Sequence, residues 1–217
     1  MTNHLTEIVF ILDRSGSMSG LESDTIGGFN AMLRKQKALA VGDAYVSTVV
    51  FNHVSHVIHD RVPIERVPDM TPDDYYVGGS TALYDALGDA IHHIEVIHKY
   101  ARPEDVPKRT LFIITTDGME NASRRYNRPE IKRMIQRQKT RYDWEFLFLG
   151  ANIDAVEAAG DIGIAPNRAV NYRCDPMGTA LNYDVLNDVV SCVRACPTGL
   201  SDDWADRIDA DFENRRE

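Results

Sequence analysis

Oxygen-bearing side chains with regular spacing stand in residues 9–21, VFILDRSGSMSGL, directly after an apolar run. Asp13, Ser15 and Ser17 form the pattern D-x-S-x-S, which offers one carboxylate and two hydroxyls. Hydroxyls are poor ligands for zinc, which favours nitrogen and sulfur. They suit Mg²⁺, a small hard ion that takes about six oxygen ligands and keeps several waters. The segment therefore predicts a binding site for a hard metal ion.

The same serines could instead include a hydrolase nucleophile. Such a serine needs an oxyanion hole, which is built partly from an earlier strand and loop. Few residues precede Gly16, and the first expected strand takes most of them. We therefore disfavour a nucleophilic serine, and we expect Ser19 to be a polar residue of the turn that leads into the first helix.

Two further segments carry oxygen ligands. Ser80 and Thr81 stand at an expected helix start in GGSTALYDAL, and Asp117 follows the apolar run TLFIITT. Neutral hydroxyls together with two carboxylates would leave a divalent ion short of negative charge. The ion would then attract an acidic group from another molecule to complete its ligand shell. This arrangement favours adhesion over catalysis.

The elements that position these residues alternate between β-rich and helical patterns. Strands are expected at residues 7–13, 44–52, 56–64, 110–118, 144–151 and 168–173. The link between the second and third strands is too short for a helical crossover, so these two should form an antiparallel hairpin. The other units predict an α/β fold, a three-layer, doubly wound, mostly parallel sheet with one antiparallel edge strand and helices on both faces. Ligands of such sheets bind beyond the carboxyl ends of the strands, where strand order reverses.

The helical patterns include a long amphipathic helix over residues 83–94, a last helix of the sheet region over 178–196, and a terminal helix in the tail. In the tail, Trp204, Ile208 and Phe212 are spaced four residues apart, which gives one apolar stripe. Ser201 is the expected cap of this helix. We therefore divide the chain into a domain over residues 1–200 and a tail over 201–217 that docks on it.

Bulk properties exclude several functions. The chain has 217 residues, a net charge of −9, 43% hydrophobic residues and 26% charged residues. A general nucleic-acid binder would show a basic face, so no nucleic-acid partner is expected. No apolar run approaches the roughly 20 residues of a membrane span, and the start of the chain lacks the pattern of a signal peptide. Three clustered cysteines make no disulfide framework, which favours a reduced, cytoplasmic protein. The sequence does not fix the oligomeric state, and a monomer is the expectation.

The order and spacing of Asp13-x-Ser15-x-Ser17, Thr81 and Asp117 resemble the metal-ion-dependent adhesion site of von Willebrand factor type A domains, and the likeness covers about residues 6–195. The resemblance implies that Ser15, Ser17 and Thr81 touch the metal. Asp13 and Asp117 would act largely through bound waters, and a partner's carboxylate would take the sixth position. It implies Mg²⁺, with Mn²⁺ or Ca²⁺ as alternatives. It also implies a non-catalytic module that captures an acidic residue of a partner protein, and ATPases are among the partners it suggests.

A metal-dependent hydrolase or phosphatase that uses the same oxygens is the alternative. It would need a general base or a nucleophile at the metal. The candidate carboxylates are committed to the ion in this scheme, and no histidine falls in the three motif segments. The loop that contains Tyr75 and Tyr76 should overlook the metal, where both rings could contact a partner or pack against the domain itself.

Overall fold

The computed structural model describes residues 5–195 and 199–215. Its centre is a six-stranded sheet with the order β3-β2-β1-β4-β5-β6. The strands are β1 (Thr6–Asp13), β2 (Ala44–Phe51), β3 (Ser55–Pro63), β4 (Arg109–Thr116), β5 (Glu145–Gly150) and β6 (Ala169–Asn171). All neighbouring strands run parallel except β2 and β3, which form an antiparallel hairpin at the edge. The predicted fold class is confirmed.

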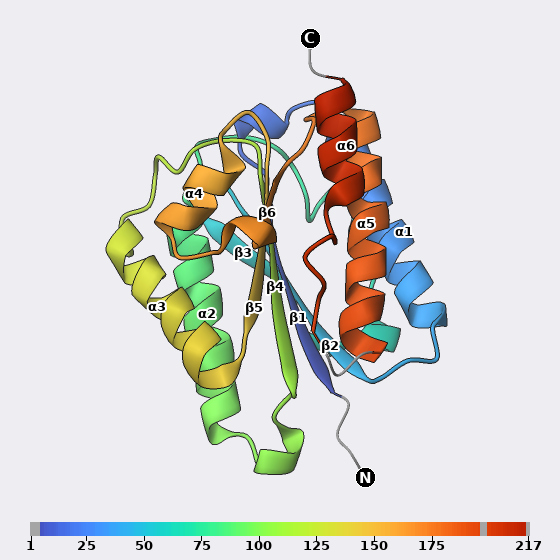
Figure 1. Ribbon diagram of the computed structural model, residues 1–217, viewed down its shortest axis with the longest axis vertical. Coiled ribbons are helices and arrows are strands. Elements are labelled where there is room, and N and C mark those ends of the chain that lie inside the picture. The colour runs from blue at the N-terminus through green and yellow to red at the C-terminus, as the bar shows by residue number, and fades with distance from the viewer. Residues whose placement is uncertain (1–4, 196–198, 216–217) are drawn as a thin grey trace.

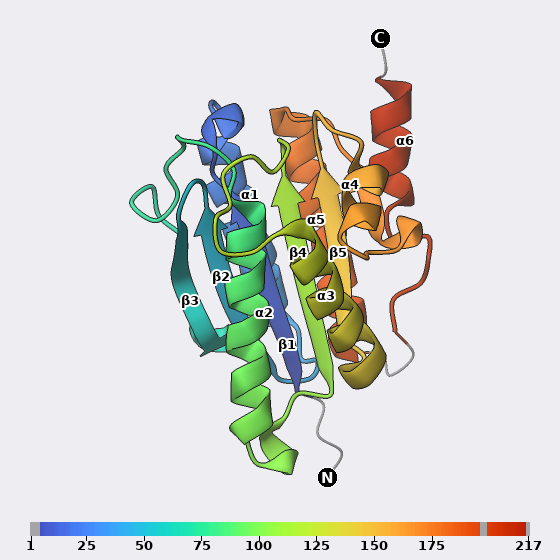
Figure 2. The same ribbon diagram turned by 90° about the vertical axis from the view of Figure 1, so that its left-hand side faces the viewer.

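Helices cover both faces of the sheet, which Figure 1 shows nearly edge-on. One layer consists of α2 (Leu83–Tyr100), α3 (Arg128–Tyr142) and α4 (Ala155–Asp161), which lie together in Figure 2. The other layer consists of α1 (Glu22–Ala38), α5 (Pro176–Ala195) and α6 (Asp206–Asn214). Each face has its own buried apolar cluster, because the central strands are apolar on both sides.

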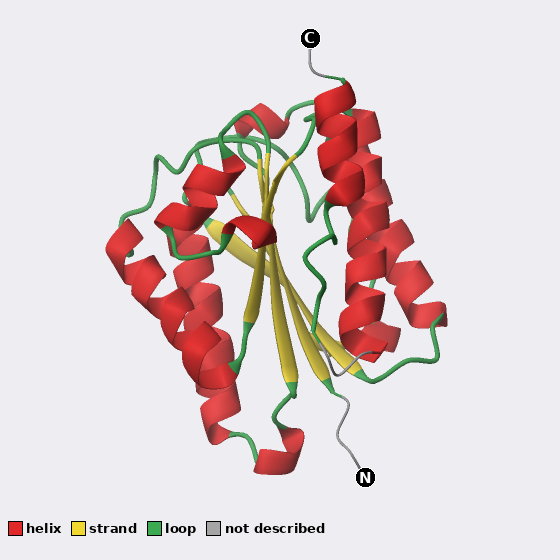
Figure 3. Cartoon of the chain, viewed as in Figure 1, coloured by secondary structure: helices red, strands yellow, loops and turns green. Residues whose placement is uncertain are grey.

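The strand order reverses between β1 and β4. From β1 the chain proceeds outward to β2 and β3, whereas β4, β5 and β6 follow on the other side. The loops that leave the carboxyl ends of β1 and β4 therefore start side by side at one end of the sheet. In Figure 3 the loops at this end lie at the top, opposite the N-terminus. This is the position at which a doubly wound sheet places its ligands.

Several elements differ from their predicted bounds: β4 ends at Thr116 and not at residue 118, and α2 continues beyond residue 94 to Tyr100. The last strand is shorter than 168–173, because Arg168 belongs to a 3-10 turn over Pro166–Arg168 and the strand ends at Asn171. The terminal helix begins at Asp206 and not at Ser201, whose hydroxyl bonds to Asp203 in a turn. Within the described residues, no helix is both long enough and apolar enough to span a membrane.

Candidate metal site

The Asp13 carboxylate is buried and is held by hydrogen bonds at both of its oxygens. Asp13 ends β1, it is 1% exposed, and its Oδ1 accepts a hydrogen bond of 2.7 Å from the backbone N–H of Ser15. Its Oδ2 accepts a bond of 2.6 Å from the hydroxyl of Thr116, the last residue of β4. The carboxylate is therefore held from both sides of the point where strand order reverses.

Ser15, Ser17 and Asp117 form a continuous set of oxygens beside Asp13. The Ser17 hydroxyl donates to Asp117 Oδ1 at 2.5 Å, and the Ser15 and Ser17 hydroxyls lie 3.2 Å apart. Ser15 and Asp117 are buried, whereas Ser17 is exposed. The structure thus brings four of the five predicted residues into one hydrogen-bonded group. This group extends from the buried carboxyl ends of β1 and β4 to the surface.

Thr81 lies next to this group across Gly118. A β-carbon placed on Gly118 would lie 3.5 Å from Ser17 Oγ and 3.7 Å from Thr81 Oγ1, so both hydroxyls face the same glycine. Thr81 is 3% exposed, whereas its neighbour Ser80 is exposed. Of these two neighbouring hydroxyl residues, Thr81 is the one whose hydroxyl is buried beside Gly118.

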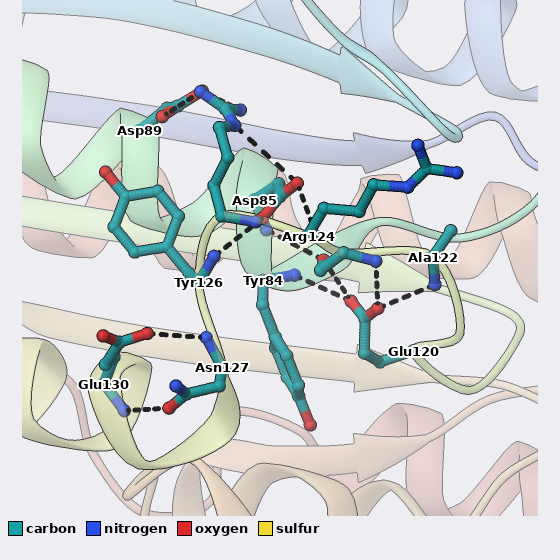
Figure 4. Close-up of polar contacts among 11 residues, drawn as sticks. Tyr84, Asp85, Asp89, Glu120, Ala122, Arg124, Tyr126, Asn127 and Glu130 are labelled. Carbon is teal, nitrogen blue, oxygen red and sulfur yellow. Dashed lines mark hydrogen bonds and ion pairs between the residues drawn. The ribbon is translucent and has the colours of Figure 1, made fainter.

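The loop that follows Asp117 is tied to the start of α2 and so sets the position of Thr81. The Thr81 N–H donates to Asn121 Oδ1 at 3.0 Å, and the Thr81 carbonyl accepts from the N–H groups of Asn121 and Ala122. The Glu120 carboxylate accepts from the backbone N–H groups of Tyr84, Ala122 and Ser123 (Figure 4). These bonds hold the Asp117 segment and the Thr81 segment together.

Asp85 fastens the next part of the same loop. It lies on the first turn of α2 and accepts three backbone N–H bonds of 2.9–3.0 Å from residues 124–126 (Figure 4). Burial raises the pKa of Asp85, but these bonds and Arg125 outweigh it and hold the pKa below its ordinary value. Asp85 therefore has a positioning role, and Arg125 is engaged by Asp85 and Asp89 at this loop.

We expect Asp85→Asn to lower the free energy of unfolding by about 1–3 kcal/mol, because an amide cannot replace a charged acceptor of three N–H groups. It should also weaken metal binding by loosening the loop between Asp117 and α2. Urea unfolding and calorimetry with MgCl₂ would measure both effects. Asp89→Asn is the matched control, since Asp89 meets the side chains of Arg125 and Tyr126 but, within the described residues, accepts no backbone N–H bond from this loop. Equal effects of the two substitutions would contradict the positioning role.

Asp13 and Asp117 place two carboxylates in a buried part of the fold. Within the described residues, neither Asp13 nor Asp117 takes part in an ion pair. Burial raises the pKa of Asp13, although hydrogen bonds from Thr116 and Ser15 lower it, and the charge of Asp117 adds to the rise. Burial likewise raises the pKa of Asp117 against the bonds from Ser17 and Cys174. A bound cation would compensate this negative charge.

The donor set fits a hard cation and not a soft one. Across residues 5–195 and 199–215, no group of three or more His, Cys, Asp and Glu side chains could hold a metal ion. The donor set at the carboxyl ends of β1 and β4 consists of two carboxylates and three hydroxyls, which are ligands for Mg²⁺-like ions. The chemistry of these residues therefore fits the divalent ion that the sequence predicts.

Solved structures share this architecture. The PilB minor pilin from Streptococcus sanguinis superposes with a TM-score of 0.61 at 11% identity, over 90% of this chain and 63% of that protein. Proximal thread matrix protein 1 from the mussel byssus, with a zinc-occupied MIDAS motif, gives 0.62 at 14% identity, over 86% and 48%. A von Willebrand factor type A protein from Catenulispora acidiphila gives 0.52 at 14% identity, over 85% and 42%. The chain has the von Willebrand factor type A fold.

This likeness confirms the fold that the motif resemblance implied. This chain spans less than two thirds of the length of each of the three proteins. Neither a protein-family model nor a curated protein matches the sequence.

In this type A fold, the loop over residues 69–79 is built against the metal-site segment. Tyr75 is 1% exposed, and its hydroxyl donates to the Asp13 carbonyl at 2.5 Å. Tyr76 is 56% exposed, and the buried guanidinium of Arg14 lies 4.2 Å from the centre of its ring. Of the two tyrosines in the loop, Tyr75 therefore packs against the metal-site segment and Tyr76 is largely exposed.

Gly79 closes this loop over the site. It has φ +80°, and a β-carbon there would lie 2.4 Å from the His53 ring. Its carbonyl accepts from the N–H of Gly16, between the two serines of the motif. A glycine is needed because both the left-handed backbone and the close imidazole exclude a side chain.

Cys174 and Thr116 are the site residues that sequence reasoning missed. The Cys174 thiol, just after β6, donates to Asp117 Oδ2 at 3.6 Å. Burial and the nearby Asp117 raise the pKa of this thiol to about 12. For Thr116, the available sequence indication was a hydroxyl at the tail of an apolar strand. For Cys174 there was none, because its contact depends on where β6 ends.

Proposed function

We propose that this chain is a divalent-metal-dependent protein-binding module. Asp13, Ser15, Ser17, Thr81 and Asp117 would hold the ion, which would supply a positive centre for an acidic residue of a partner protein. The observation that carries the proposal is the pair of buried carboxylates that are grouped with hydroxyls and form no ion pair with any described residue. The zinc-occupied motif of the mussel byssus protein supports a divalent ion at this position of the fold.

We propose Mg²⁺ as the ion, with Mn²⁺ as the closest substitute. Hydroxyl and carboxylate oxygens favour hard cations. Zinc binds such oxygens less readily than nitrogen or sulfur, so the zinc in the byssus protein does not make zinc the preferred ion here.

We also propose a cytoplasmic location, because Cys174 carries a free thiol that a reducing compartment would preserve.

We further propose that the module is not an enzyme. Hydrolysis at a metal needs a general base or a nucleophile at the reacting atoms. Within the described residues, no imidazole hydrogen-bonds to any of the five candidate ligands. Burial and the nearby Asp117 raise the pKa of the Cys174 thiol, which does not favour a thiolate nucleophile. A phosphatase role is therefore the less favoured alternative.

Calorimetric titration of metal-stripped protein tests the metal site. We expect saturable binding of Mg²⁺ and Mn²⁺, and tighter binding in the presence of acetate, whose carboxylate stands in for the partner's acidic residue. Asp13→Ala should abolish both signals. Absence of binding with and without acetate would overturn the proposal. Turnover of a generic phosphate ester that is lost both with EDTA and in Ser15→Ala would establish the enzymatic alternative.

A further inference from the structure

A pocket of about 250 Å³ lies directly beside the proposed metal site, between the starts of α2 and α4. Gly118 belongs to both features. It lines the pocket, and its Cα faces the hydroxyls of Ser17 and Thr81. A chemical group at the metal and a side chain in the pocket would therefore be neighbours, close enough to come from one segment of a partner.

The walls of this pocket are largely apolar. Those walls include Leu83, Tyr84, Phe148, Ile153, Ala158 and Ile162. The Tyr84 side chain points away from the Glu120 carboxylate that binds its backbone N–H (Figure 4). Met119, which is 74% exposed, is also among the lining residues. Such walls suit a long aliphatic or aromatic side chain.

All the charged residues that line the pocket are acidic. They are Glu120, Asp154, Glu157 and Asp161, and no Lys or Arg is among the lining residues. Glu120 is held by backbone N–H groups, and Asp161 pairs with Arg128 at 2.6 Å. The exposed Glu157 carboxylate has no hydrogen bond or ion pair with any described residue. The pocket thus combines an apolar wall with an acidic rim on which one carboxylate is available.

We infer that this pocket receives a lysine or arginine side chain from the same partner segment whose acidic residue binds the metal. This inference rests on the proposed function. Lys and Arg bury their aliphatic stems on apolar surface and keep the cation at the rim. The Tyr84 ring can also contact such a cation through its face. The preferred ligand is therefore a short segment that carries an acid and a base close together.

The net charge of the module supports this choice. At −9, the chain repels an acidic partner at long range, and one metal ion compensates only part of that charge. A basic side chain beside the acid would offset the repulsion and meet Glu157 at the rim. A purely apolar side chain would contact the apolar walls but would leave the Glu157 carboxylate at the rim without a cation.

Selection from a random heptapeptide library displayed on phage tests the inference. Phage would be bound in MgCl₂ and eluted with EDTA, so that only metal-dependent binders are read. We expect the eluted peptides to share an acid, with Lys or Arg enriched at a fixed offset from it. A peptide with that base replaced by leucine should bind about fivefold more weakly, the scale of one partly exposed ion pair.

Two variants separate the pocket from general charge effects. Glu157→Lys should abolish the enrichment of basic residues while leaving the shared acid. Glu65→Lys makes the same charge change beyond the end of β3, at the opposite end of the sheet, and should retain the enrichment. A shared acid without a basic residue, or a basic preference that survives Glu157→Lys, would overturn this inference and leave the metal site standing. Eluted peptides without a shared acid would overturn both proposals.

Discussion

In Asp117→Asn, we expect the melting temperature to stop responding to MgCl₂, while the metal-free variant melts at or above the temperature of metal-free wild type. The amide oxygen can still accept the hydrogen bond from Ser17. The substitution removes the negative charge that a cation needs, but it also removes a buried charge that pairs with no cationic side chain among the described residues. A Mg²⁺ concentration of 100 Kd should stabilise wild type by about 2.7 kcal/mol and the variant by almost nothing.

The same argument fixes the sign of the pH dependence. In the metal-free protein the pKa of Asp13 and that of Asp117 are both raised by burial. Protonation therefore favours the folded state, and this contribution is fully present below the unfolded pKa of about 3.9. It is lost as the pH rises through the raised folded pKa. Because Mg²⁺ binds the ionised form, the rise in melting temperature caused by Mg²⁺ should grow over this pH range and be smallest in acid.

Melting curves with and without MgCl₂, taken at several pH values, measure these effects. Asp73→Asn is the control, because Asp73 is an exposed residue of the loop over 69–79 and the change in charge is the same. The control should keep the full response to Mg²⁺. A response of Asp117→Asn as large as that of wild type would show that Mg²⁺ acts elsewhere on the molecule.

The placement of these residues could be predicted because it follows from strand periodicity and topology. Asp13 ends one apolar strand and Asp117 follows another, and parallel neighbours bring their carboxyl ends to the same end of the sheet. Thr81 could be placed only through the motif resemblance, since the chain reaches it after a hairpin and an irregular loop. Its position depends on bonds with residues some 40 positions later, such as Asn121. No local pattern encodes that pairing.

For the loop residues, the position near the metal site was easier to predict than the direction in which each side chain points. Tyr75 and Tyr76 are adjacent and identical in type, yet one is buried and one is exposed. The difference arises because Tyr75 reaches the Asp13 carbonyl, whereas the Tyr76 ring lies over Arg14. In irregular backbone there is no alternation to assign side chains to a face, so sequence alone left both options open.

We expect Trp204→Ala to cause the largest loss of stability among single substitutions in the tail. Trp204 is 9% exposed and belongs to the apolar cluster on the α1 and α5 face, together with Ala205 and Ile208. Its indole N–H donates to the Asn167 carbonyl at 2.9 Å. Removing a buried aromatic side chain costs about 3–5 kcal/mol, and the carbonyl would lose its partner as well.

Urea unfolding measures this loss, and Phe212→Ala is the matched control. Phe212 is half-buried, and the Arg173 guanidinium lies 4.8 Å from the centre of its ring. Its removal should cost only about 1 kcal/mol.

A chain that ends at Leu200 should lose at least as much stability as Trp204→Ala. It also loses the 2.5 Å contact between Arg215 and Asp175, next to the Cys174 segment that bonds to Asp117. Unchanged stability after this truncation would instead mean that the tail only lies on a domain that is complete at residue 200.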